Sequence, residues 1–180
     1  MIAKFWKIFD FVSKIRKLSS YLYCVVVIGS TDGKAYKVAI ETVQTNDYKS
    51  ITKSRYFFDW KKERSQEVYK LTIVGSSDIL GLVSVERIPE EWQIHIRLIT
   101  VSKENKGSDK VYENITGNLI TFISKIAVRE YGELACVSLK PKDAIAQHYV
   151  DKFGMNITGM MLSIEIAEIL ALINTYDHDY

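Results

Sequence analysis

A polar segment, residues 103–118, stands between a strand-like run and an apolar helical run, and two of its three lysines and both of its glycines are candidates for binding a ligand. A loop in this place leads to a helix N-terminus, whose first amide groups have no partner within the helix. Such amides bind phosphate groups well, and nearby lysines add positive charge. The four residues are Lys106, Lys110, Gly107 and Gly117. The order therefore predicts a pyrophosphate-bearing cofactor, held by backbone amides between Tyr112 and Asn118.

The histidines and cysteines suggest no second kind of site. His95, His148 and His178 lie too far from one another and from the cysteines to give metal-ligand spacing, so we expect no metal. Cys24 and Cys136 each stand in an apolar strand-like run, which favours buried free thiols over a disulfide. The sequence also has no Walker loop and no nucleophile elbow.

The composition is that of one ordinary α/β domain. With 180 residues, the chain is long enough to form a core without disulfides. A net charge of +2 with 26% charged residues argues against a DNA partner. No apolar run is long enough to span a bilayer, and the start of the sequence has no cleavable signal pattern, so a cytoplasmic protein is expected.

The first twenty residues are expected to form an element of their own. Segment 4–18 has the apolar spacing of an amphipathic helix, with lysines on the opposite face. Docking on its own domain or contact with another copy is the favoured role, which leaves a homodimer open, and membrane contact is the less favoured alternative. Residues 21–180 are expected to form a single domain.

Alternating β-rich runs predict an antiparallel sheet in the first half of this domain. The Asp32-Gly33 pair predicts a hairpin between runs 21–29 and 34–43. Residues 44–67 are polar and aromatic, and are either a helix that packs its aromatics into the core or a mobile element beside a substrate. The favoured reading is the helix. Three further runs predict an antiparallel meander: 68–74, 79–88 and 92–101.

In the second half, helical and strand-like runs alternate. The order predicted is an amphipathic helix, a short apolar strand, a second helix, a final strand and a closing helix. The first four of these elements are expected at 119–132, 133–139, 142–155 and 156–166.

This order of elements resembles the GNAT superfamily of acyl-CoA-dependent N-acetyltransferases, over about residues 68–165. Two strings are similar to a bacterial GNAT-like subfamily. One is N-x-G-x-x-K-x-Y followed by G-N-L-I-x-F, from Asn105 to Phe122, and the other is SLKPK with A-x-HY-x-x-K-x-G-M, from Ser138 to Met155. The resemblance implies a mostly antiparallel mixed sheet flanked by helices. It also implies that the sheet splays where the central strand and the strand after the long helix part, which forms a cofactor cleft.

The resemblance further implies transfer of an acetyl group from acetyl-CoA to a primary amine. Tyr149 stands where the family has a tyrosine that protonates the departing coenzyme A thiolate. Its alternative role is that of a core tyrosine whose hydroxyl lies at the rim. The implied cofactor-binding residues are Lys110, Tyr112, Asn114, Ile115, Thr116, Gly117 and Asn118.

Two departures from the family pattern keep a second function open. Val111, Asn114 and Thr116 stand where the family has a cation or amide and two glycines, and Thr100 replaces a glutamate on the central strand. Of the remaining base candidates, His95 is favoured for its near-neutral pKa, ahead of two glutamates. A solvent-side strand histidine is its alternative reading. The alternative function is a non-catalytic GNAT-fold binding module. The two glutamates are Glu86 and Glu91.

Overall fold

The computed structural model describes residues 25–176, with the side chain of Asp143 outside that description. The predicted helix at 4–18 and Cys24 lie outside the described residues, so the separate N-terminal element stays a prediction.

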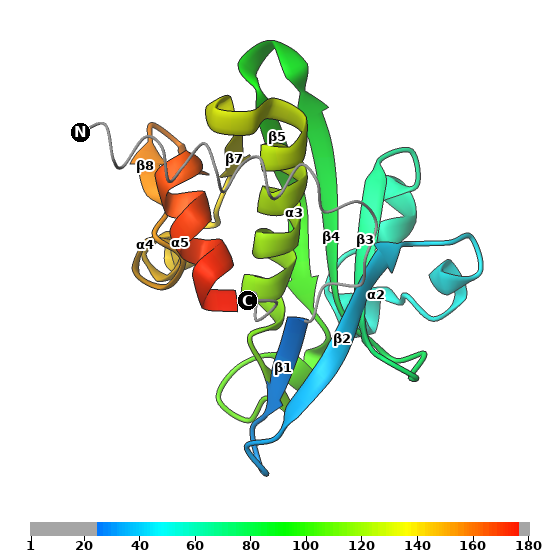
Figure 1. Ribbon diagram of the computed structural model, residues 1–180. Helices are drawn as coiled ribbons and strands as arrows, with labels where there is room; N and C mark the ends of the chain where they lie inside the picture. The colour runs from blue at the N-terminus through cyan, green and yellow to red at the C-terminus, as the bar shows by residue number, and fades with distance from the viewer. Residues whose placement is uncertain (1–24, 177–180) are drawn as a thin grey trace.

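The described residues form one sheet of nine strands in the order β6-β1-β2-β3-β4-β5-β7-β9-β8 (Figure 1). Neighbouring strands are antiparallel, except that β5 and β7 are parallel. This confirms the predicted hairpin, the meander and the mostly antiparallel mixed sheet. The strands are β1 Val25–Gly29, β2 Ala35–Thr42, β3 Glu67–Ile73, β4 Ile79–Ile88, β5 Gln93–Val101, β6 Tyr112–Glu113, β7 Cys136–Leu139, β8 Asn156–Thr158 and β9 Met161–Ile164.

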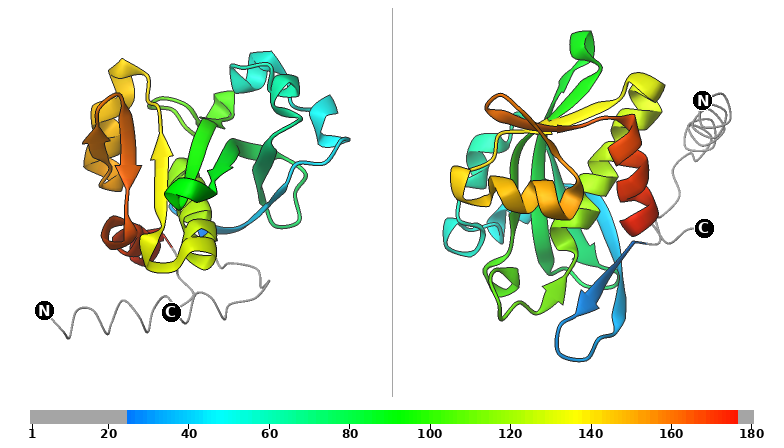
Figure 2. Two further views of the ribbon diagram at one scale, coloured as in Figure 1. Left: turned by 90° about the horizontal axis from the view of Figure 1, so that it is seen from above. Right: turned by 90° about the vertical axis from the view of Figure 1, so that its left-hand side faces the viewer.

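Helices cover both faces of the sheet. The long helix α3 and the closing helix α5 pack on one face, and the short helical turns before β3 lie on the other (Figure 2). No helix within residues 25–176 is long and apolar enough to cross a bilayer. The helices are α2 Lys53–Tyr56, α3 Ile115–Tyr131, α4 Ala146–Phe153 and α5 Ile166–Tyr176. The 3₁₀ turns are η1 Asp47–Lys49, η2 Trp60–Glu63, η3 Pro89–Glu91, η4 Lys103–Asn105, η5 Gly132–Leu134 and η6 Asp143–Ile145.

Several elements differ from the prediction in their bounds. Strand β7 begins at Cys136, three residues later than predicted, and helix α4 is shorter than the predicted 142–155 at both ends. Helix α3 begins at Ile115, four residues earlier than predicted, because Asn114 has a left-handed φ of 67° that turns the chain into the helix. Ile115 is buried and supplies the first apolar position of the helix. The predicted final strand is a hairpin, β8 and β9, in which Gly159 makes the turn at a φ of +62°.

The aromatic segment before β3 packs into a second apolar cluster, which confirms the helix reading for most of its rings. Tyr56 is fully buried and donates from its hydroxyl to the Ile79 carbonyl at 2.8 Å, and Trp60 is 1% exposed. Phe57 is different. It is 46% exposed and has a left-handed φ of 63°, which an aromatic residue rarely adopts.

A β-bulge in β5 breaks the strict period-two alternation of side chains along that strand. Leu98 pairs with Ser84 and Ile96 with Val85, so Arg97 has no partner on β4. An extra residue in one strand reverses the alternation beyond it. Ile94 and Ile96 therefore pack in the same cluster as Ile99 and Val101, whereas Leu98 packs in the cluster on the other face. A strict period of two had placed Ile99 and Val101 opposite Ile94 and Ile96.

Cys136 is a free, half-buried thiol, as predicted. Burial raises its pKa to about 11, with Glu165 and Glu91 adding to the shift. The thiol is therefore protonated at neutral pH and suited to packing rather than to nucleophilic chemistry.

Candidate functional site

The parallel strands β5 and β7 pair along only part of their length. Residues Gln93 to Ile96 of β5 pair with Cys136 to Leu139 of β7, and beyond Ile96 the strands separate. Figure 2 shows the two strands diverging. Among residues 25–176, residues 97–101 of β5 therefore have no partner strand on the β7 side, which leaves this edge free within the described structure. Peptide groups at such an edge can bind an extended ligand.

A cavity of about 360 Å³ occupies the place where the strands part. One wall is residues 96–101 of β5, and the other is Leu139 with the loop that follows β7. Phe57, Lys106, Thr116 and Tyr149 complete the lining. The cavity thus joins the β5 edge to the first turn of α3 and to α4.

A second cavity of about 280 Å³ lies at the N-terminus of α3. Val101, Lys106 and Thr116 line both cavities, so the two are neighbours. The amides of Ile115, Thr116 and Gly117 form no hydrogen bond within the described part of the chain. Unpartnered amides at a helix N-terminus bind phosphate, and lysines on the same wall add charge. This cavity fits a pyrophosphate group.

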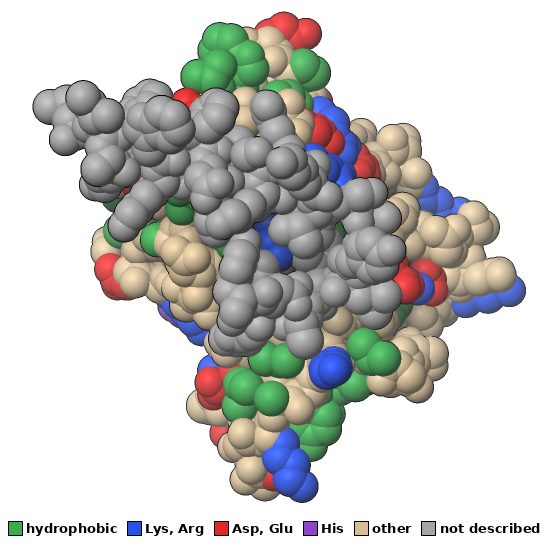
Figure 3. All heavy atoms as spheres, in the orientation of Figure 1, with side chains coloured by type: hydrophobic (Ala, Val, Ile, Leu, Met, Phe, Trp, Pro, Cys, Tyr) green, Lys and Arg blue, Asp and Glu red, His purple; other side chains and the backbone are tan. Residues whose placement is uncertain are grey.

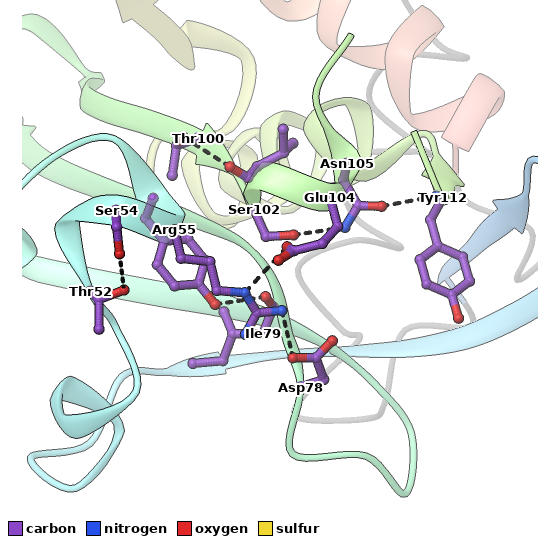
Figure 4. Close-up of polar contacts among 12 residues, drawn as sticks. Thr52, Ser54, Arg55, Asp78, Ile79, Thr100, Ser102, Glu104, Asn105 and Tyr112 are labelled. Atoms are coloured by element: carbon purple, nitrogen blue, oxygen red, sulfur yellow. Dashed lines mark hydrogen bonds and ion pairs between the residues drawn. The ribbon is translucent and has the colours of Figure 1, made fainter. Parts of the chain in front are cut away.

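Hydrogen bonds inside the loop between β5 and β6 fix its shape. The Asn105 side chain is buried; its Nδ2 donates to Ser102 Oγ at 2.9 Å, and its Oδ1 accepts from the Tyr112 amide at 2.9 Å. Arg55 bonds Asp78 at 2.7 Å and Glu104 at 3.2 Å, which ties η4 to α2 and to the β3–β4 turn (Figure 4). The loop is therefore held in place from both sides.

Six of the seven predicted cofactor-binding residues line the second cavity. They are Lys110, Tyr112, Asn114, Ile115, Thr116 and Gly117. Asn118 does not line it, because its amide donates to the Asn114 carbonyl at 3.0 Å and its side chain donates to the Val26 carbonyl at 2.7 Å. Asn118 thus fixes α3 to β1.

Gly117 serves packing rather than backbone freedom. It lies in the first turn of α3, and a Cβ built there would collide with the ring of Tyr176. Close packing of α5 on α3 explains the glycine. Gly107 does have a left-handed φ of +87° and lines the second cavity.

Tyr149 lies on α4 at the wall of the first cavity. Its ring is buried beside Phe153, with centroids 5.6 Å apart, and burial raises the pKa of its hydroxyl. The hydroxyl makes no hydrogen bond to any other described residue. It is thus a protonated donor beside the cavity, as well as part of the core.

None of the three predicted base candidates lines either cavity. Nδ1 of His95 lies 2.9 Å from Ser138 Oγ, a contact across the paired part of β5 and β7. Burial lowers the pKa of His95. Glu86 bonds Arg97 at 3.0 Å, and Glu91 accepts from Gln93 in the turn after β4. Thr100 does line the first cavity, and its hydroxyl donates to the Val101 carbonyl at 3.1 Å.

The sequence did not indicate the ion pair between Arg97 and Glu63. Glu63 of η2 is 6% exposed and accepts from Arg97 Nε at 3.1 Å and from Ser84 Oγ at 2.6 Å. Together Glu63 and Glu86 hold the guanidinium at the bulge, beside the first cavity, and both raise its pKa. An isolated buried glutamate and an arginine 34 residues later carry no recognisable spacing signal.

Charge is distributed differently over the surface and inside the cavities. Where described residues are visible in Figure 3, most basic side chains lie close to acidic ones. The first cavity has no carboxylate among its described lining residues, and the second has Glu113 alone, which pairs with Lys110 at 3.4 Å. A cavity lined by one sign of charge attracts ligands of the other sign.

Comparison by sequence gives no relative: no family model matches the chain, and no curated protein matches it. Comparison by structure does. A Desulfovibrio desulfuricans acetyltransferase that is assigned to the GNAT family has a TM-score of 0.54 at 12% identity, over 72% of this chain and 99% of that one.

Two further solved structures are similar. A Bacillus subtilis acetyltransferase in complex with CoA has a TM-score of 0.54 at 9% identity, over 72% of this chain and 99% of that one. A mutant spermidine N-acetyltransferase of Vibrio cholerae has a TM-score of 0.54 at 11% identity, over 74% of this chain and 96% of that one. The chain has the fold of the GNAT acetyltransferases, with two parallel strands that separate and with helices on both faces of the sheet.

Proposed function

We propose that the protein is an N-acetyltransferase that binds acetyl-CoA between β5 and β7 and transfers the acetyl group to a primary amine. The observation that carries the proposal is the free edge of β5 at residues 97–101, which faces a cavity continuous with the N-terminus of α3. The edge suits the two amides of a pantetheine arm. The unpartnered helix amides, with Lys106 and Lys110, suit a pyrophosphate.

Acetyl-CoA supplies a thioester: the amine nitrogen forms a bond to the acetyl carbon as the carbon–sulfur bond breaks. Tyr149 donates a proton to the departing thiolate, since its pKa is raised and its hydroxyl is unbonded among the described residues. The proton lost from the amine passes to water.

The cationic lining of the first cavity replaces a carboxylate base in this mechanism. Thr100 stands at the position expected for a base and cannot remove a proton at neutral pH. Nearby positive charges lower the pKa of a bound ammonium group, and so favour the neutral amine that attacks. The cavity therefore selects the deprotonated acceptor.

A binding titration tests this function. Acetyl-CoA at 100 times its dissociation constant should stabilise the folded protein by about 2.7 kcal/mol. Adenosine diphosphate has the pyrophosphate without the pantetheine arm, and should bind more weakly by calorimetry. Mass spectrometry of a mixed pool of amines with acetyl-CoA should then detect an acetylated product.

A non-catalytic binding module is the second candidate, and the lack of a carboxylate among the described lining residues of the first cavity favours it. The titration and the transfer assay together distinguish the enzyme from the binding module. Binding of acetyl-CoA without transfer to any amine supports the binding module, and failure to bind at millimolar concentration removes the proposed enzyme.

A further inference from the structure

Six basic residues line the two cavities, against the single carboxylate of Glu113 among the described lining residues. A thioester cofactor with several phosphates accounts for some of these charges. The second cavity, at the helix terminus, supplies the residues nearest to the pyrophosphate position. The six are Arg97, Lys106, Lys110, Lys140, Lys142 and Lys152.

Four of these six cations already have a partner within the described residues. Two form ion pairs and two lie over aromatic rings. The pairs are Arg97 with Glu63 and Glu86, Lys110 with Glu113, Lys106 at 4.2 Å from the Phe57 ring centroid, and Lys152 at 5.8 Å from that of Phe153. Lys140 and Lys142 make no such contact with any described side chain.

Lys140 and Lys142 lie near the proposed site of acetyl transfer rather than near the proposed pyrophosphate site. Lys140 follows Leu139, the last β7 residue paired with β5, so both lysines lie beside the point where the strands part. Pro141 between them fixes its own φ and restricts the residue before it. Neither lysine lines the second cavity.

We propose that the acceptor amine carries an anionic group, a carboxylate or a phosphate, which Lys140 and Lys142 bind. This inference rests on the proposed function. Two unpaired ammonium groups beside a cavity without a described carboxylate attract an anion and repel a polycation. Phe57 and Ile145, 46% and 43% exposed, line the same cavity and suit the carbon skeleton of the acceptor.

Matched acceptors that differ in the anionic group test the inference. Phenylalanine against phenethylamine probes a carboxylate, O-phosphoethanolamine against ethanolamine probes a phosphate, and spermidine is the polycation. We expect kcat/KM to be about tenfold or more higher for the anionic member of at least one pair, which corresponds to one charge-assisted hydrogen bond. A preference for the uncharged members or for spermidine, or no turnover of either anionic amine, overturns the inference.

A double variant tests the residues. Lys140→Gln/Lys142→Gln should remove the preference within the responding pair by raising KM for its anionic member more than for its uncharged member, with acetyl-CoA affinity unchanged by calorimetry. Lys61→Gln/Lys62→Gln removes two exposed, neighbouring lysines of η2, away from both cavities, and is the matched control. If the first variant instead weakens acetyl-CoA binding, the lysines serve the cofactor and the inference is wrong, while the proposed function stands. A protein that binds no acetyl-CoA removes the proposed function itself.

Discussion

The ring of Tyr176, at the end of α5, fills the space beside Gly117 where a side chain would lie. A larger residue must push α5 away from α3, and overpacking of this kind costs about 1–3 kcal/mol. We expect Gly117→Val to lower the free energy of unfolding by that amount in a urea titration. The double variant Gly117→Val/Tyr176→Leu should recover part of the loss, because the smaller side chain makes room. Equal losses in the single and double variants would show that the two residues do not interact.

Substitution of Tyr149 should separate catalysis from stability. Tyr149→Phe keeps the ring that packs against Phe153 and deletes a hydroxyl with no partner among the described residues. The melting temperature should stay close to that of the parent chain. Loss of a general acid lowers turnover by about 10²–10⁴-fold, and acetyl-CoA affinity should not change. Undiminished turnover would assign Tyr149 to packing alone.

The buried carboxylate of Glu63 should make Arg97 important for stability. Arg97→Met leaves the Glu63 carboxylate buried without its cation; because the Arg97 side chain is itself 35% exposed, we expect a loss of about 1–3 kcal/mol, that of a buried polar group deprived of a partner. Glu86 is exposed, so Glu86→Gln should cost at most about 1 kcal/mol and serves as the control. Chemical denaturation measures both. The double variant Glu63→Gln/Arg97→Met should be more stable than Arg97→Met, and the reverse order would argue against the pair.

His95 should make the stability of the protein fall on mild acidification. Burial holds its folded pKa below the ordinary 6.5, with Arg97 lowering it further and Glu86 opposing. As the pH falls below about 6.5 the unfolded chain takes up a proton before the folded chain does, so stability decreases with falling pH until the folded pKa is passed. His95→Gln should show a smaller drop in melting temperature between pH 7 and 5.5. His148→Gln, which removes an exposed histidine, is the matched control, and identical slopes in all three proteins would contradict the assignment.

The succession of strands and helices could be predicted because it rests on local patterns. The Asp32-Gly33 turn, the meander and the helices after β5 all follow from periodicity and turn residues. The bulge at Arg97 could not be predicted, since it depends on how β4 and β5 align and not on either strand alone. One extra residue there reversed the faces of Ile99 and Val101.

The sequence brought six of the predicted residues together at the second cavity, because consecutive residues stay together in any fold, and Tyr149 lines the first cavity. Their roles toward a cofactor stay predictions. Phe57 and Lys140 come to the same cavity from segments more than eighty residues apart, and no local pattern records that approach. Likewise, the burial of Glu63 follows from the packing of η2 on the sheet.

The short strand β6 pairs with β1 and so carries the end of the loop onto the sheet. With Asn105 and Arg55 holding the rest, the loop reaches the helix start already in one shape. Ordering a flexible backbone costs roughly 1–2 kcal/mol per residue, and a ligand that must impose this order loses that much affinity. Here the order is set when the protein folds. Binding of a ligand at the N-terminus of α3 should therefore resemble the docking of two rigid bodies. Its association rate should be limited by diffusion and charge rather than by rearrangement of the loop.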